Sequence, residues 1–197
     1  MSCAVFAASR HHYDEVLNEV ADRAASVGSL GKVEIGALVV WKRLRANTPW
    51  VMSLMGKPDA EVREITAAAR TAALDPSLSV VEAAGQARNA LKSLPGCRGG
   101  GNAVASAMLT ALAPDRMAVY DRRAYSALSL LFDGNVPRSY SYADYMKTVD
   151  DLRQQVGRGW GTATWTSRSS PWGSDRTRPN RCLLYTSDAA DDLLCVD

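Results

Sequence analysis

Metal-binding side chains are scarce in this sequence. It has two histidines, His11 and His12, and four cysteines, none of which form a CxxC pair. A zinc site or an iron–sulfur cluster would need several such ligands brought together, so we expect no metal and no cofactor. The scattered cysteines also fit a reduced, cytoplasmic protein, because disulfides persist mainly in oxidising compartments.

Long apolar runs and a large net charge are missing as well. No stretch reaches the roughly 18 apolar residues that a transmembrane helix needs, and the start "MSCAVFAASRHHYDEV" lacks the basic region of a signal peptide. The formal net charge is +2, so composition alone does not demand a nucleic-acid partner. We therefore expect no membrane contact, and we expect a monomer.

The sequence is rich in alanine, and its apolar residues recur with helical spacing. Hydrophobic residues make up 47% of its 197 residues, which is enough for one core, and the spacing of these residues favours helices. We predict an all-α fold, a single domain of about eight helices. The expected helices cover residues 13–27, 32–47, 48–56, 58–74, 79–93, 102–113, 121–132 and 141–155.

Local signals support several of these helices. Ser79 with Glu82, and Ser141 with Asp144, are spaced as helix-capping pairs. The basic end of the second helix, from Lys42 onward, suits the negative end of a helix dipole. The segment "MAVY" before the seventh helix is expected to be short and extended. Trp41 and Trp50 are expected to pack in the core or at its rim.

The segment "LPGCRGGGN", from Leu94 to Asn102, separates two expected helices. Glycines adopt positive φ and expose backbone N–H groups. The next helix begins there with free N–H groups and the positive end of its dipole. A phosphate can sit against such a surface, with Arg98 as an added cation. The segment therefore predicts a helix–hairpin–helix that grips the backbone of duplex DNA without reading its sequence.

These residues resemble the helix–hairpin–helix DNA glycosylase superfamily, in particular its 8-oxoguanine DNA glycosylase-like branch. That family carries LPG-x-G, a hairpin, a small-residue helix and an extended V-x-D that supplies a catalytic aspartate. Ala103 and Asp121 stand at the family's interval between hairpin and aspartate. The resemblance extends over residues 32–155, and its recognisable motifs are Leu94-Pro95-Gly96, Gly101, Ala103 to Ala107 and Val119-Tyr120-Asp121.

Two features depart from the family. The hairpin is longer than its usual form, and Ala103 stands where bifunctional members have a Schiff-base lysine, with Lys92 on the other side of the hairpin. The resemblance therefore implies a monofunctional glycosylase, which removes a damaged base from duplex DNA without amine-mediated strand cleavage. Asp121 would stabilise an oxocarbenium-like sugar and orient water after the base is flipped out.

The candidate residues also have ordinary structural explanations. Asp121 is expected to cap its helix, either as its whole role or together with catalysis. Arg122 and Arg123 either contact phosphate or pair with nearby acids, and cations at a helix start oppose the dipole, which favours binding. Tyr120 is expected to form a wall of the substrate pocket. The residues expected to contact DNA are Gly96, Arg98, Gly99, Gly100, Gly101, Asn102, Arg122 and Arg123.

Three functions fit these observations. The first is a DNA glycosylase-like enzyme, the second a DNA-binding module without chemistry, and the third a helical scaffold that binds protein. The hairpin favours the first two over the third. The spacing of Asp121 favours the first, whereas the missing lysine and the longer hairpin favour the second.

Composition changes after Gln155, where tryptophan is crowded among Ser, Thr, Arg, Gly and Pro without a helical period. Tryptophan has a single codon, so Trp165 and Trp172 fix the underlying bases. With GC-rich codons, the run from Thr162 to Gly173 can be read one frame over as "DGDVDLALFALG", which has the apolar spacing of an amphipathic helix. This tail is therefore interpreted as shifted in frame.

The run "CLLYTSDAAD", from Cys182 to Asp191, resembles the translation of a transposase-based sequencing adapter. The match covers every residue of that run. We therefore divide the chain into a helix–hairpin–helix domain at residues 1–157 and a disordered tail at residues 158–197 that derives from the frame shift and the adapter. We expect no functional residues in this tail.

Overall fold

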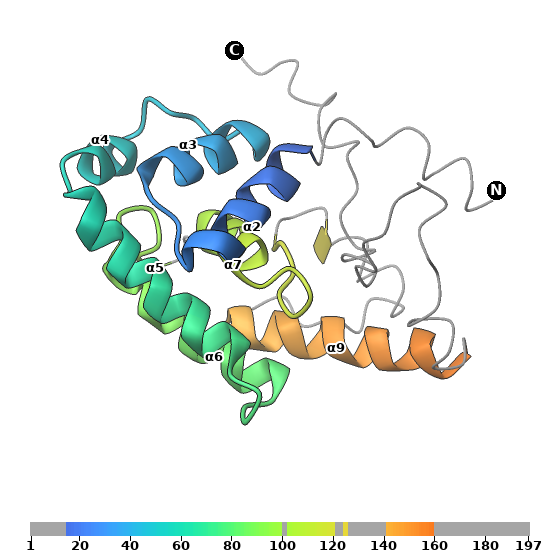
Figure 1. The fold of residues 1–197 in the computed structure, drawn as a ribbon. Coiled ribbons are helices and arrows are strands. Elements are labelled where there is room, and N and C mark those ends of the chain that lie inside the picture. The colour runs from blue at the N-terminus through green and yellow to red at the C-terminus, as the bar shows by residue number, and fades with distance from the viewer. Residues whose placement is uncertain (1–14, 100–101, 121–123, 126–140, 160–197) are drawn as a thin grey trace, which may run out of the picture.

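The computed structural model describes residues 15–99, 102–120, 124–125 and 141–159. Within these residues the chain forms seven α-helices, one 3-10 helix and no strand, which confirms the all-α class (Figure 1). None of the helices in this part combines the length and apolar character that a membrane span requires. The elements are α2 (Glu15–Val27), α3 (Lys32–Trp41), α4 (Pro49–Met55), α5 (Asp59–Leu74), α6 (Val80–Ala90), η1 (Leu91–Ser93), α7 (Asn102–Leu112) and α9 (Tyr142–Gly159).

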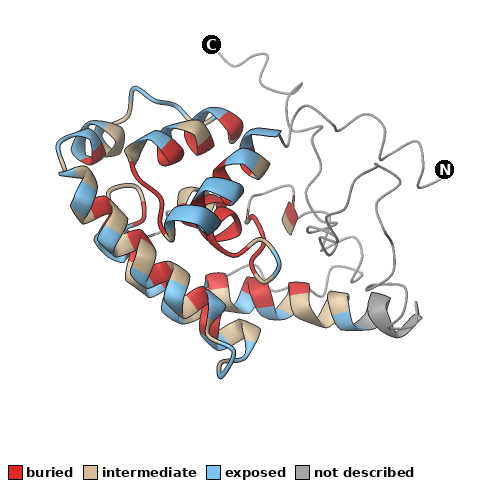
Figure 2. Cartoon of the chain, viewed as in Figure 1, coloured by how far each residue is buried: buried red, intermediate tan, exposed pale blue. Residues whose placement is uncertain are grey.

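Helix α7 packs against α2, α3, α5 and α6. Helices α5 and α6 form one pair, and α9 packs along α6, while α2 and α3 form a second pair (Figure 1). Ala105, Ser106 and Ala107 of α7 are all buried, and Figure 2 shows buried residues on the faces that the helices turn toward one another. Side chains this small let neighbouring helix axes approach closely.

The predicted capping pairs are confirmed at two helix starts. The Ser79 hydroxyl accepts from the Glu82 backbone N–H at 3.2 Å, and the Glu82 carboxylate accepts from the Ser79 N–H at 2.9 Å. Ser141 and Asp144 make the same reciprocal bonds at 3.2 and 3.3 Å. Each pair satisfies two N–H groups that would have no partner within the helix.

Helix α3 ends earlier than the sequence predicted, at Trp41 instead of Asn47. Arg43 adopts a left-handed conformation with φ of 53°. Its N–H donates to the Val40 carbonyl, and the Leu44 N–H donates to the Val39 carbonyl at 2.9 Å. These two bonds form a Schellman ending. Glycine is the usual signal for such an ending, but the sequence carries an arginine there. Because the helix ends at Trp41, the basic run that begins at Lys42 lies outside it.

A buried carboxylate joins α2, α3 and α5. The Glu34 side chain is 5% exposed and pairs with Arg23 at 3.1 Å and with Arg63 at 3.0 Å. It also accepts from the Gly31 N–H at 2.8 Å. Burial by itself would raise the pKa of Glu34, but these backbone hydrogen bonds and the two arginines outweigh it and hold the pKa below its ordinary value. Arg63 also bonds Asp59 at 2.7 Å.

The remaining predicted boundaries agree closely with the structure. Helix α4 begins at Pro49, within one residue of the predicted start, and proline suits the first position of a helix. The predicted fifth helix is confirmed as two elements, α6 and η1. Helix α9 continues past the predicted end at Gln155 to Gly159. The helix predicted over residues 121–132 lies outside the described residues, apart from Ala124 and Tyr125, which are helical.

Candidate functional site

The turn after η1 has the backbone geometry that its glycines predicted. The Leu94 N–H donates to the Leu91 carbonyl at 3.0 Å, and the Cys97 N–H donates to the Leu94 carbonyl at 3.1 Å. Gly96 has φ of 81° and Gly99 has φ of 59°. Residues with side chains rarely adopt these values, so glycine is favoured at both points.

Gly96 also makes room for Trp50. A Cβ atom at Gly96 would lie 2.6 Å from the Trp50 ring, which is closer than real Cβ atoms approach other atoms. Trp50 is half-buried on α4 and packs against the core. The packing role predicted for Trp50 is thus confirmed, and Trp41 is buried in the core as well. The tryptophan fixes the inner side of the turn against α4.

Arg88 and Cys97 hold the turn from inside. Arg88 is buried at the end of α6 and donates to the Gly99 carbonyl at 3.2 Å. Cys97 is fully buried, and burial raises the pKa of its thiol to about 12, although Arg88 acts in the opposite direction. The thiol is therefore protonated and unreactive at neutral pH. No signal in the sequence sets Arg88 apart from the exposed arginines.

The outer side of the turn carries Arg98 and Gly99, both of which are exposed. Asn102 begins α7 directly after the turn. Gly100 and Gly101 lie outside the described residues. Ala103, in the first turn of α7, and Lys92, exposed in η1, are on opposite sides of the turn in sequence.

The segment from Met117 to Tyr120, the predicted extended "MAVY", has no regular secondary structure, and its first three residues are buried. The Tyr142 hydroxyl donates to the Ala118 carbonyl at 2.7 Å. The Tyr145 hydroxyl donates to the Val119 carbonyl at 2.8 Å. Both tyrosines project from the buried face of α9. Because their hydroxyls bond backbone carbonyls, α9 fixes the backbone of the segment.

Ser106 of α7 fixes the last residue of that segment. Its hydroxyl lies 3.2 Å from the Tyr120 carbonyl and also 3.2 Å from the Ala103 carbonyl. The residue that immediately precedes Asp121 is therefore bonded to the first turns of α7. The Tyr120 ring is half-buried and meets the Tyr145 ring edge to face, with centroids 4.9 Å apart.

Arg116 fixes the start of the same segment. Its guanidinium donates to three backbone carbonyls at the end of α5 and in the connection to α6, those of Ala73, Asp75 and Leu78, at 3.0, 2.7 and 2.8 Å. Sequence reasoning missed this contact, because the partners lie some forty residues earlier in the chain and are backbone atoms. Asp121, Arg122 and Arg123 themselves lie outside the described residues.

The described residues contain no group of three or more His, Cys, Asp and Glu side chains that could hold a metal ion. Comparison of the chain with protein-family models, curated proteins and solved structures finds no match. A functional assignment therefore depends on the residues and on the geometry described above.

Proposed function

We propose that the protein binds duplex DNA through the turn and the start of α7, and that Asp121 assists removal of a damaged base. The observation that carries the proposal is the Ser106 contact, which bonds the Tyr120 carbonyl to the beginning of α7. In this proposal the carboxylate of the next residue, Asp121, acts near that helix start, which suits phosphate. The segment leading to it is fixed by Tyr142 and Tyr145, as a positioned group requires.

DNA binding of this kind would use backbone groups more than side chains. The turn exposes Gly99 and Arg98, and the first N–H groups of α7 have no partner within the helix. These donors suit phosphate oxygens, which carry no sequence information. The turn is held from inside by Trp50 and Arg88, so little ordering is needed when DNA binds.

The proposed reaction breaks the bond between the sugar C1′ and the base nitrogen. The bonding electron pair leaves with the base, and the sugar develops oxocarbenium character that the Asp121 carboxylate stabilises. Water then adds to C1′, and the proton that it loses neutralises the departing base, which gives a free base and an abasic site. Ala103 has no amine, so no Schiff base forms, and borohydride is expected to trap no protein–DNA adduct.

A DNA-binding module without chemistry is the second candidate. Ala103 and the long glycine run favour it, because the run alters the turn in comparison with the family that the sequence resembles. Such a module would keep the phosphate contacts and release no base from any duplex.

Salt titration of DNA binding tests the binding part of the proposal. We expect weak binding to duplexes of unrelated sequence, with a shallow loss of affinity as salt rises, because one turn contacts few phosphates. Arg98→Ala is expected to weaken binding equally on all sequences. Lys147→Ala, which removes an exposed positive charge from α9, serves as the matched control and should bind like the parent. Salt-independent binding, or an unchanged affinity for Arg98→Ala, would count against the proposal.

A further inference from the structure

The turn lies next to the basic connection between α3 and α4. Trp50 of α4 packs against Gly96, where an added Cβ would lie 2.6 Å from the Trp50 ring. Arg98 follows Gly96 by two residues, which span at most roughly 7 Å. Arg45 lies near the same tryptophan, because its carbonyl accepts from the hydroxyl of Thr48 at 3.2 Å, two residues before Trp50. Both arginines are exposed, so the packing of Trp50 holds two basic segments beside each other.

Neither of these two segments contains an acidic residue. Residues 35–58, which include the connection, and residues 83–114, which include the turn, have no Asp and no Glu, although both carry lysine and arginine. The first carboxylates after the connection, those of Asp59 and Glu61, each pair with a nearby basic side chain. Positive charge around Trp50 is therefore not interspersed with carboxylates of the same segments, and such a surface attracts a polyanion.

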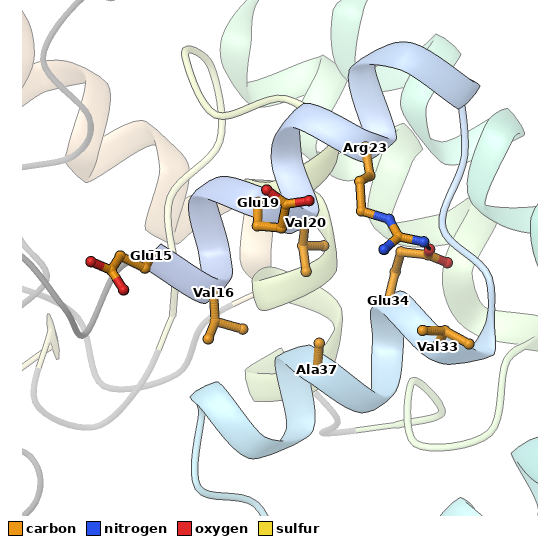
Figure 3. A pocket seen from close by; sticks show the side chains of 8 residues that line it. All are labelled: Glu15, Val16, Glu19, Val20, Arg23, Val33, Glu34 and Ala37. Carbon is orange, nitrogen blue, oxygen red and sulfur yellow. Dashed lines mark ion pairs between the residues drawn. The ribbon is translucent and has the colours of Figure 1, made fainter.

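Acidic side chains gather between α2 and α3 instead. Glu15 and Glu19 of α2 line a pocket there, and Arg23 pairs with Glu34 at 3.1 Å in the same pocket (Figure 3). A duplex suits this pocket poorly, because its phosphates would meet carboxylates. The charge of the described helices is thus unevenly distributed, and the basic part of it includes the turn.

The backbone of the connection is fixed by hydrogen bonds at both of its ends. The Schellman ending of α3 fixes Arg43 and Leu44, and the hydroxyl of Thr48 fixes Arg45. Within the described part of the chain, neither the Arg45 nor the Arg98 side chain forms an ion pair. Their guanidinium groups can therefore bind a ligand without breaking an ion pair and with little ordering of the backbone.

We propose that the α3–α4 connection, through Arg45, makes a second contact with the backbone of the duplex that the turn binds through Arg98. A guanidinium suits this task because it donates two parallel hydrogen bonds to phosphate oxygens. A B-form duplex presents phosphates across grooves that are roughly 6 and 12 Å wide, a scale that two neighbouring arginines span. The inference rests on the proposed DNA binding and enlarges the bound surface, and it does not depend on chemistry at Asp121.

Salt titration of duplex binding by the full chain tests the second contact. Arg45→Ala is expected to lower the affinity about threefold and to make the slope of log affinity against log salt shallower by about 1, as the loss of one phosphate contact does. Arg98→Ala should have the same effect, and the double variant should lose both contributions. Lys147→Ala is the control and should bind like the parent. Circular dichroism should stay unchanged in every variant, because the substituted side chains are exposed.

The outcomes separate this inference from the proposed function. Weaker binding by Arg98→Ala with unchanged binding by Arg45→Ala would overturn the inference and leave the proposed function standing. Unchanged binding by both variants would overturn the two together. Weaker binding by Arg45→Ala alone would contradict the turn as a contact, and with it the shared surface. Displacement of the duplex by polyglutamate at equal charge would also overturn the inference, because the surface would then suit an acidic protein.

Chemical modification checks the same contact without a substitution. Phenylglyoxal modifies accessible guanidinium groups, and mass spectrometry locates the products. Saturating duplex DNA is expected to slow the modification of Arg45 and Arg98 together, while Arg153 of α9 should react at the same rate as in the free protein. An unchanged rate of modification at Arg45 would overturn the inference, even where Arg98 is protected.

Discussion

Gly96 is the residue at which the turn depends most on a missing side chain. It combines a positive φ with the close approach of the Trp50 ring. Both requirements exclude a Cβ atom. A Cβ would strain the backbone at this φ, and it would also collide with the Trp50 ring. The sequence predicted the first requirement from the glycine alone. The second could not be predicted, because it depends on where α4 packs.

Gly96→Ala is therefore expected to lower the free energy of unfolding by about 1–3 kcal/mol, from backbone strain together with displacement of a packed ring. Urea unfolding measures this change. Gly36→Ala is the control, since Gly36 is exposed within α3 and nothing lies within 4 Å of its added Cβ. That change should be neutral or stabilise by up to about 1 kcal/mol. If the two variants unfold alike, the role assigned to Gly96 is wrong.

At the scale of elements, the junction of α2, α3 and α5 depends on ionised carboxylates. Glu34 has a pKa held below its ordinary 4.5 although burial opposes this, and Asp59 has a pKa held below 3.8, chiefly by the hydrogen bond from the Lys32 N–H. A lowered pKa in the folded state means that the unfolded state binds more protons as the solution becomes acidic. The stabilisation is therefore complete above pH 4.5 and is lost as the pH falls through the folded-state values.

Glu34→Gln should remove part of this pH dependence. At neutral pH we expect a loss of about 1–3 kcal/mol, because Arg23 and Arg63 lose a buried charged partner. Below pH 4 the difference from the parent should shrink. Urea unfolding at several pH values checks this, with Glu64→Gln on the exposed side of α5 as the control. A difference between Glu34→Gln and the parent that stays constant down to pH 3 would contradict the assignment.

Elements were predicted well where their signals are local. Ser79 and Glu82 fix a helix start with contacts three residues apart, and Pro49 marks another start. The end of α3 could not be predicted, because Arg43 takes a conformation that its side chain disfavours. The Arg116 contacts with the end of α5 and the connection after it could not be predicted either, because they depend on how the helices pack against one another. For the same reason, the sequence predicted which motifs form the candidate site but not how their residues are arranged in space.

At the scale of the whole molecule, the turn, α7 and α9 are linked through the segment that precedes Asp121. Helix α7 begins at the turn, Ser106 bonds the residue before Asp121, and the two tyrosines of α9 hold the segment behind it. The sequence predicted that the turn and the aspartate belong together, from their spacing. It did not reveal that α9 is the element that fixes the segment between them.

Base release by the parent and by Asp121→Asn tests this account most directly. A panel of lesion-containing duplexes should identify at least one base that the parent releases under single-turnover conditions. Asp121→Asn keeps the shape and the capping ability of the residue, so folding should change little, while release falls by about 10²-fold or more. DNA affinity should stay equal or rise, since a negative charge near phosphate is lost. Asp115→Asn, an exposed change of the same charge, should behave like the parent. Full activity of Asp121→Asn, or binding without release of any base by the parent, would contradict the enzymatic account.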